Sequence, residues 1–248
     1  MTDQVVIVTG GSRGIGRATA LAAAKRGFRV VVGYASNKAA ADDVVATIEQ
    51  SNGKAIAVKC DVGDEQDILA LFEAADAFGT LGALVNNAGI VGPSIRVDEM
   101  SAERIARMMA VNVTGSILCA REAVKRLSTK HGGQGGVIVN LSSVAAKLGS
   151  PNTYVDYAAS KGAIDSFTIG LGYEVANEGI RVDAIRPGLI DTDIHASGGE
   201  PDRAHRLAGN VPMKRVGTAD EIANAIVWLL SDEASYVTSA ILDVSGGR

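Results

Sequence analysis

The stretch VVIVTGGSRGIG, residues 5–16, decides the fold of this 248-residue chain. Four β-branched aliphatic residues, typical of a buried strand, lead directly into a turn that holds Gly10, Gly14 and Gly16, and an alanine-rich helical pattern follows. Glycine in such a turn permits positive φ and close backbone approach, and the helix amino terminus offers free N–H groups to a pyrophosphate. This order favours a dinucleotide site, although its Gly-x3-Gly-x-Gly spacing differs from the more familiar Gly-x-Gly-x-x-Gly.

Short β-rich runs alternate with longer alanine-rich stretches along the rest of the chain. This alternation predicts an α/β protein with a parallel sheet covered by helices on both faces. No internal repeat or low-complexity linker marks a second domain, so we expect a single domain over residues 1–248. The predicted strands are 4–9, 29–34, 54–59, 83–86, 137–141, 181–186 and 241–244, and the predicted helices are 14–26, 38–50, 65–78, 102–127, 154–177 and 219–231.

Composition excludes several classes of protein. Apolar residues make up 47% of the chain, charged residues 21%, and the net charge is -4, which is ordinary for a globular protein and gives no basic excess for nucleic acid. No basic leader precedes the first strand and no run is long enough to span a bilayer, so we expect a cytoplasmic protein without a membrane partner. Cys60 and Cys119 are expected to be buried thiols rather than a disulfide or metal site.

The glycine turn also contains the pattern Gly10-x-Ser12-x-Gly14, which is the form of a hydrolase nucleophile elbow. A serine hydrolase using Ser12 is therefore an alternative from another reaction class. Against it, the nucleophile would lie after the first strand, where no earlier loop can donate an oxyanion hole. The candidate bases, His131, His195 and His205, do not follow a clear late strand. The hydrolase reading is therefore disfavoured.

Tyr157 and Lys161 are four residues apart in the predicted helix 154–177 and therefore share one face. An ammonium group beside a phenol favours the anionic form of the phenol, which suits a tyrosine for acid/base chemistry near neutral pH. The spacing alone also fits an ordinary surface pair. Ser142 and Ser143, at the end of the preceding predicted strand, supply hydroxyl groups upstream of the tyrosine.

These motifs occur together in the order and approximate spacing of a known family. The sequence resembles the short-chain dehydrogenase/reductase family over essentially its whole length, most closely the 3-oxoacyl-carrier-protein reductases and glucose 1-dehydrogenases of classical type. The resemblance implies a Rossmann-type, doubly wound parallel sheet of about seven strands, with the cofactor across the carboxyl ends of the strands. The residues that carry the resemblance are 9–16, 86–89, Asn112, Ser143, Tyr157, Lys161, Pro187 and Gly188.

The resemblance implies four catalytic residues. Tyr157 would donate a proton to a carbonyl oxygen, or remove one from an alcohol, while hydride moves from or to a nicotinamide. Lys161 would lower the pKa of the phenol and hold the nicotinamide ribose. Ser143 would hydrogen-bond the substrate oxygen, and Asn112 would carry a proton relay through water to Lys161.

Two positions depart from the family pattern. The interval from Ser143 to Tyr157 is about one residue longer than expected, and rigid counting would reach Val144, which has no hydroxyl group. Ser143 is therefore preferred, with Ser142 as the fallback, and the extra residue is expected in the loop 147–153. Asp183 stands where the family commonly has asparagine, and we expect it to be structural.

The residues after the second predicted strand favour NADP(H) over NAD(H). A carboxylate there would bind the ribose 2′-hydroxyl of NAD, but no acidic residue occurs between the end of this strand and Asp42. Arg13 could meet a 2′-phosphate, and Ser36 and Asn37 could donate hydrogen bonds to it. By resemblance, Asp61 and Val62 would contact the adenine. The full predicted cofactor-binding set is Gly10, Ser12, Arg13, Gly14, Ile15, Gly16, Tyr34, Ser36, Asn37, Asp61, Val62, Asn87, Ala88, Gly89, Tyr157, Lys161, Pro187, Gly188 and Thr192.

The remaining expectations concern substrate, metal and assembly. A polar segment, residues 191–216, is the expected substrate lid, and the substrate is a small carbonyl or alcohol compound. Asp191-x-Asp193-x-His195 lacks further ligands at suitable spacing, so no metal is expected. Apolar residues on more than one face of the helices 102–127 and 154–177 favour a homo-oligomer, with a tetramer expected. A catalytically weak cofactor-bound sensor or scaffold of the same fold is the alternative to an oxidoreductase.

Overall fold

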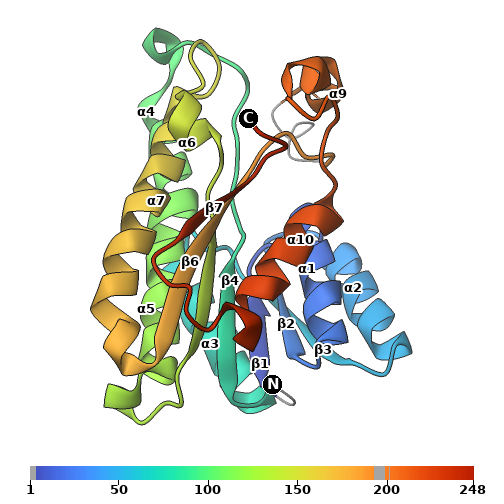
Figure 1. Cartoon of the computed structure of the whole chain (residues 1–248), viewed down its shortest axis with the longest axis vertical. Helices are drawn as coiled ribbons and strands as arrows, with labels where there is room; N and C mark the ends of the chain where they lie inside the picture. Colours follow the sequence, from blue (N-terminus) through green and yellow to red (C-terminus); the bar gives the residue numbers. More distant parts are fainter. Residues whose placement is uncertain (1–3, 193–198, 201) are drawn as a thin grey trace.

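The computed structural model describes residues 4–192, 199–200 and 202–248. Its centre is a parallel sheet of seven strands in the order β3-β2-β1-β4-β5-β6-β7 (Figure 1). The order reverses beside β1, which confirms the predicted doubly wound α/β fold. The strands are β1 (Val5–Val8), β2 (Arg29–Tyr34), β3 (Lys54–Lys59), β4 (Leu81–Asn86), β5 (Gly136–Leu141), β6 (Ile180–Pro187) and β7 (Ile241–Val244).

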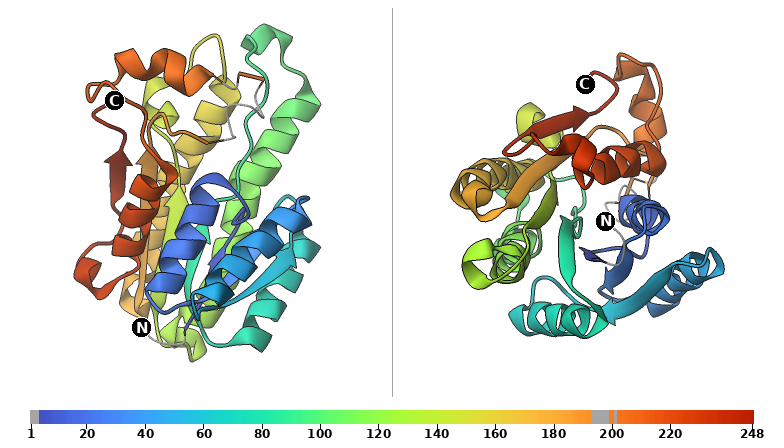
Figure 2. Two further views of the ribbon diagram at one scale, coloured as in Figure 1. Left: turned by 90° about the vertical axis from the view of Figure 1, so that its right-hand side faces the viewer. Right: turned by 60° about the horizontal axis from the view of Figure 1, so that its bottom comes forward.

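Helices cover both faces of this sheet (Figure 2). Helices α1, α2 and α10 pack on one face, and α3, α5 and α7 pack on the other. The α-helices are α1 (Gly14–Lys25), α2 (Lys38–Gln50), α3 (Glu65–Phe78), α4 (Ala102–Met109), α5 (Ser116–Leu127), α6 (Ala145–Leu148), α7 (Val155–Val175), α9 (Arg203–Leu207) and α10 (Ala219–Leu229). A π turn, η2 (Ala110–Gly115), joins α4 to α5, and short 3-10 turns are η1 (Val97–Glu99), η3 (Thr129–His131), η4 (Ala176–Glu178), η5 (Ala208–Asn210) and η6 (Asp232–Ala234).

Strand β1 shows why a continuous apolar run is needed here. Val6 and Val8 face the core under α1 and α10, whereas Val5 and Ile7 face the core under α3 and α5. All four side chains are fully buried. Because side chains alternate between the faces of a strand and both faces are covered, every position of β1 must be apolar.

Polar side chains fix where several helices begin. Asn37 accepts a hydrogen bond from the backbone N–H of Ala40 at the start of α2, and Asp64 accepts one from Gln66 at the start of α3. Thr218 and Glu221 form a reciprocal capping box at α10. Such caps satisfy backbone N–H groups that have no partner inside the helix, and so they fix the helix start.

The turns after β1 and β4 are tied together at the carboxyl edge of the sheet. The Thr9 hydroxyl accepts hydrogen bonds from the backbone N–H groups of Asn87 and Ala88, both at 3.0 Å. The Asn87 amide donates to the carbonyl oxygens of Thr9, at 2.8 Å, and Gly10, at 3.0 Å. This is the point at which the strand order reverses, where ligands of open α/β sheets bind.

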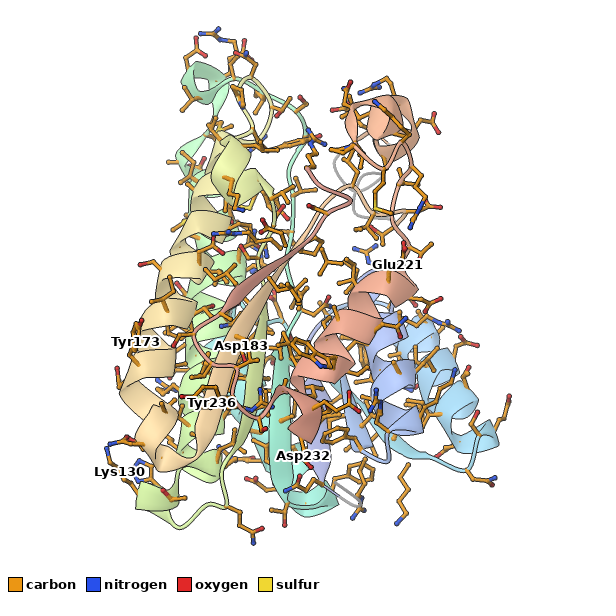
Figure 3. All side chains as sticks on the ribbon, viewed as in Figure 1. Lys130, Tyr173, Asp183, Glu221, Asp232 and Tyr236 are labelled. Atoms are coloured by element: carbon orange, nitrogen blue, oxygen red, sulfur yellow. The ribbon has the colours of Figure 1, made fainter. Side chains whose placement is uncertain are left out.

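The structure corrects three predictions about elements. The helix predicted over 102–127 is interrupted by η2, and α6 and α9 were not predicted. The remaining predicted strands and helices are present with small differences at their ends. Asp183, on β6, is fully buried and accepts a hydrogen bond from the Ala240 N–H at 3.1 Å, which fits the structural role expected for it (Figure 3).

Candidate active site

Two adjoining cavities open at the carboxyl edge of the sheet. The first, which we call the glycine-turn cavity, has a volume of about 440 Å³ and lies over the turn between β1 and α1. The second, the tyrosine cavity, has a volume of about 180 Å³ and contains Tyr157 and Lys161. Ile15, Asn87, Gly89 and Thr192 line both cavities. One extended ligand can therefore occupy both.

The glycine turn is shaped for close approach of a ligand to the backbone. Gly10 and Gly14 have φ of +62° and +52°, values that residues with a side chain rarely adopt. A Cβ atom on Gly16 would overlap the Gly10 carbonyl and the Asn87 amide. Arg13 precedes the first residue of α1, and its side chain makes no capping hydrogen bond. The first N–H groups of α1 therefore have no side-chain cap from Arg13 where they border the cavity.

Most of the predicted cofactor residues meet in the glycine-turn cavity. Its walls include Gly10, Ser12, Arg13, Gly14, Ile15, Gly16, Ser36, Asn37, Asp61, Val62, Asn87, Ala88, Gly89 and Thr192. Tyr34 does not line either cavity: its side chain is buried in the core under α1 and α2. The end of β2 turns Tyr34 inward, because successive strand residues point to opposite faces.

Asp61 is held by two partners at the wall of this cavity. One carboxylate oxygen accepts the Gly63 N–H at 2.9 Å, and the other accepts Arg107 Nη2 at 2.6 Å. These hydrogen bonds lower the pKa of Asp61 even though burial opposes them as the largest single influence. Arg107 and Cys60 also line the cavity and were not predicted. Arg107 comes from α4, far along the chain, and only the tertiary fold brings it here.

The tyrosine cavity brings together the pair that the sequence singled out. Tyr157 and Lys161 project from α7, and Ser142 and Ser143 follow β5. Lys161 Nζ donates to the Leu141 carbonyl oxygen at 2.6 Å and lies 5.7 Å from the centroid of the Tyr157 ring. The Ser142 hydroxyl donates to the Lys161 carbonyl oxygen at 3.2 Å. Ser142 is therefore engaged with the helix backbone.

Burial dominates the electrostatics of this pair. It raises the pKa of Tyr157, and a hydrogen bond with Ser143 lowers that pKa by less. The net direction is opposite to the lowering predicted from Lys161. Burial also lowers the pKa of Lys161 from 10.5 to about 8, against the opposing charge of Asp165 one turn further along α7. Of the two serines, Ser143 is the one whose hydroxyl affects the pKa of the phenol.

Asn112 lies within η2 and is fully buried. Its Oδ1 accepts the Ile90 N–H at 2.8 Å, and its Nδ2 donates to the Ile90 carbonyl at 3.0 Å and the Ser160 hydroxyl at 3.1 Å. Asn112 lines neither cavity and has no direct hydrogen bond to Lys161. A Cβ on Gly89 would, however, sit 3.4 Å from Asn112 Oδ1 and 3.6 Å from Lys161 Nζ, so both groups border the space left by this glycine.

Several wall residues of the tyrosine cavity were expected and others were missed. Pro187, Gly188 and Thr192, which belong to the predicted cofactor-binding set, line it, and so do Val91, Ser150 and Tyr154. Leu189, Ile190 and Arg248 were not predicted. Of these three residues, only Arg248 stands in a recognisable sequence pattern, because it follows the glycine pair Gly246 and Gly247.

The side chains that the structure describes give the hydrolase alternative no histidine base, and the side chain of His205 is not among them. Ser12 lines the glycine-turn cavity, but His131 lies in η3 ahead of β5, at the opposite edge of the sheet. His195 lies outside the residues that the structure describes. Asp193 is outside them too, and within the described ranges no group of three His, Cys, Asp or Glu side chains is arranged for a metal ion.

Comparison with known proteins identifies the class. A family model described as enoyl-(acyl carrier protein) reductase matches residues 10–248. The chain is 56% identical to the uncharacterized oxidoreductase YgfF of Escherichia coli over 98% of this chain and 99% of that protein. It is 41% identical to glucose 1-dehydrogenase 2 of Bacillus subtilis over 100% of this chain and 95% of that protein.

Solved structures agree. A short chain dehydrogenase from Burkholderia cenocepacia in complex with NADP superposes with a TM-score of 0.89 at 32% identity, covering 98% of this chain and 97% of that one. A 7α-hydroxysteroid dehydrogenase complexed with NADH and 7-oxo glycochenodeoxycholic acid superposes with a TM-score of 0.91 at 34% identity, covering 98% of this chain and 93% of that one. The chain belongs to the short-chain dehydrogenase/reductase family and is an oxidoreductase that acts on alcohol or carbonyl groups with a nicotinamide cofactor.

Among the described residues no helix is both long and apolar enough to cross a membrane.

Proposed function

We propose that this protein is an NADP(H)-dependent carbonyl reductase or alcohol dehydrogenase in which Tyr157 is the general acid/base. The observation that carries the proposal is the meeting of Tyr157, Lys161 and Ser143 in a cavity continuous with the glycine turn. When bound, a nicotinamide cofactor supplies hydride to the carbonyl carbon or accepts it from the alcohol carbon. Gly16, where a side chain would not fit, and Arg13, which has no ion pair among the described residues, are both compatible with a bound dinucleotide phosphate.

In the reduction direction, Tyr157 donates its phenolic proton to the substrate oxygen as the carbon gains hydride. The raised pKa keeps Tyr157 protonated at neutral pH, so the phenol holds the proton that it donates. Ser143 hydrogen-bonds the same region and aligns the substrate oxygen with the phenol. The Lys161 ammonium stabilises the phenolate that remains. Asn112 would hold a water molecule that relays a proton to Lys161, beside Gly89, where both side chains border the same space.

The preference for NADP(H) rests on charge at the end of β2. The segment after Tyr34 exposes Ser36 and Asn37 to the cavity, and Arg13 faces it from the glycine turn. Asp42, the first acid after β2, is paired with Lys38 at 2.7 Å and does not line the cavity. A 2′-phosphate would therefore meet a cation and hydrogen-bond donors rather than a carboxylate.

We propose that the chain works as one domain with residues 191–216 as the lid. In the described part of this segment, Glu200 accepts a hydrogen bond from the Tyr154 hydroxyl at 3.0 Å, and Tyr154 lines the tyrosine cavity. Thr192 lines both cavities. A cytoplasmic location is part of the same proposal.

We also propose a homotetramer, in which exposed apolar side chains form the subunit contacts. Ile105 and Met109 on α4 and Ile169 and Tyr173 on α7 are exposed, Tyr173 by 78%. Tyr236 is fully exposed just before β7, in a segment that contacts α7 (Figure 3). Exposed apolar side chains of this kind favour burial in contacts between identical subunits.

The direct test of the function is a substrate screen in both directions. NADPH oxidation would be followed with ketones, aldoses and 3-oxoacyl thioesters, and NADP reduction with the matching alcohols. Turnover of a carbonyl compound, with NADPH preferred to NADH, supports the proposal. Binding of NADPH without turnover of any member would instead favour the sensor or scaffold.

A further inference from the structure

Arginines without a protein partner mark the two cavities. Almost every arginine side chain that the structure describes is held by a carboxylate, a backbone carbonyl or an aromatic ring of the protein. Within the described part of the chain, Arg13 and Arg248 are the exceptions. Arg13 lines the glycine-turn cavity and Arg248 lines the tyrosine cavity. A guanidinium at a cavity wall with no carboxylate of its own is available to an anion on the ligand.

The backbone after β7 places Arg248 at the wall of the tyrosine cavity. The Gly188 N–H donates to the Val244 carbonyl at 3.1 Å, which continues β7 alongside the cavity wall. Gly246 and Gly247 then adopt φ of +66° and +92°, left-handed values that turn the chain. The Ser245 hydroxyl donates to the Arg248 carbonyl oxygen at 3.0 Å and fixes the backbone of the arginine.

The other residues that line the tyrosine cavity are uncharged or already have a hydrogen-bond partner in the protein. No Asp or Glu belongs to the described lining, and aliphatic side chains such as Val91, Leu148 and Leu189 form much of it. Lys161, the other cation, is buried and donates to the Leu141 carbonyl. Outside the lining, Glu200 is held by the Tyr154 hydroxyl and by Arg206, so it is engaged elsewhere.

We propose that Arg248 binds an anionic group of the substrate, so that the tyrosine cavity selects carbonyl or alcohol compounds that carry a carboxylate or a phosphate. This inference rests on the proposed function and names its substrate class. The reacting carbonyl would lie at Tyr157 and Ser143, and the anion would lie against Arg248, with an aliphatic linker along the apolar wall. In the cavity, a charge-assisted bond to guanidinium favours the anion over its neutral analogue.

The test uses two matched pairs of probes. One is 4-oxopentanoate with its methyl ester, and the other is dihydroxyacetone phosphate with dihydroxyacetone. The dissociation constant of each probe is measured by calorimetry on the enzyme–NADP complex, and kcat/KM is measured by NADPH oxidation. We expect the wild type to favour the anion in at least one pair by about tenfold or more. The pair that shows the preference tells carboxylate from phosphate.

Three variants identify the residue responsible. Arg248→Gln should remove the preference for the anion while leaving the neutral probe unchanged, and Arg248→Lys should restore part of it. Arg26→Gln is the matched control, because it removes an arginine charge paired with Glu233 away from both cavities. Equal binding of anion and neutral probe by the wild type, or a preference that survives Arg248→Gln, would overturn the inference.

The binding measurement separates this inference from the proposed function. If the wild type binds the anion better through Arg248 but reduces no carbonyl compound, the inference stands and the proposed catalysis fails. If it reduces the ester as well as the carboxylate, and Arg248→Gln changes neither, catalysis stands and the inference fails.

Discussion

At the scale of single residues, the site is governed by burial of ionisable groups. Lys161 is 5% exposed, and its Nζ has a backbone carbonyl as its hydrogen-bond partner rather than a carboxylate. Such a position disfavours the charged amine, which is why the pKa falls to about 8. The protein therefore gives up stability to keep an ammonium group beside Tyr157, as functional sites commonly do.

Lys161→Met should stabilise the cofactor-free protein at pH 7. The folded-state pKa of about 8 lies below the ordinary 10.5, so the unfolded chain holds the proton more tightly. Below pH 8 the native state bears the full cost, roughly 3 kcal/mol as an upper bound, and this cost shrinks between pH 8 and 10.5 as the native lysine loses its proton. Urea unfolding at pH 7 and at pH 10 measures the difference between variant and wild type. A difference that stays constant or grows with pH contradicts the assigned burial cost.

Arg13→Ala should weaken NADPH binding by about tenfold and leave NADH nearly unchanged, because the guanidinium would lose a bond that only the 2′-phosphate offers. Fluorescence titration of both cofactors measures this. The control is Arg17→Ala, one turn along α1, whose guanidinium is paired with Asp43 at 3.3 Å. Equal losses for NADPH and NADH would remove the argument for NADP preference.

Patterns along the sequence predicted site residues best where the reactive side chains lie close together on one helix. Tyr157 and Lys161 lie on one helix, so their helical spacing was enough to place them together. The side chain of Tyr34, also in the predicted cofactor-binding set, lies in the core instead of either cavity, because its direction depends on the register of β2 in the sheet. Arg107 and Arg248 reach the cavities through tertiary contacts, which a pattern along the chain cannot reveal.

At the scale of elements, the glycine turn and η2 do most to shape the site. The turn between β1 and α1 excludes side chains from the glycine-turn cavity, and η2 places Asn112 between the Ile90 backbone and α7. A π turn inside a longer helix is frequently found at functional sites. Because α4, η2 and α5 follow one another without a gap, the sequence predicted one unbroken helix here.

Gly16→Ala should damage the glycine turn. The added methyl group would overlap the Gly10 carbonyl and the Asn87 amide, so the turn must open at a cost of about 1–3 kcal/mol. We expect a lower melting temperature and NADPH binding weakened by tenfold or more, measured by thermal unfolding and fluorescence titration. Gly209→Ala is the control, since a Cβ there has no atom within 4 Å among the described residues. Unchanged NADPH affinity in Gly16→Ala would show that the turn does not hold the cofactor.

At the scale of the whole molecule, a parallel sheet covered on both faces was predictable because the alternation of strands and helices is regular, whereas the doubly wound arrangement came from the resemblance to the family. The short helices α6 and α9 were not, since they have too few residues for a periodic pattern. The amino half of the sheet supplies the glycine-turn cavity, and the strands from β5 onward supply the tyrosine cavity. Residues near the end of the chain complete the second cavity, so the site needs the whole fold.

Tyr173→Asp and Tyr236→Asp should lower the solution mass. Each places a charge on an exposed apolar surface, and burial of that charge in a subunit contact is costly. Light scattering coupled to size-exclusion chromatography should show a tetramer for the wild type and smaller species for the variants. Val97→Asp is the control, because Val97 is exposed by 64% but belongs to η1 rather than to α7 or the segment before β7. A monomeric wild type at micromolar concentration would contradict the proposed assembly.

The central claim is that Tyr157 transfers the proton in an NADP(H)-linked reaction, and Tyr157→Phe tests it most directly. The substitution removes one hydroxyl group from a buried ring and leaves the glycine-turn cavity untouched. With the best substrate from the screen, kcat should fall by roughly a thousandfold while the NADPH dissociation constant changes by less than about threefold. Turnover retained near the wild-type rate would contradict the mechanism.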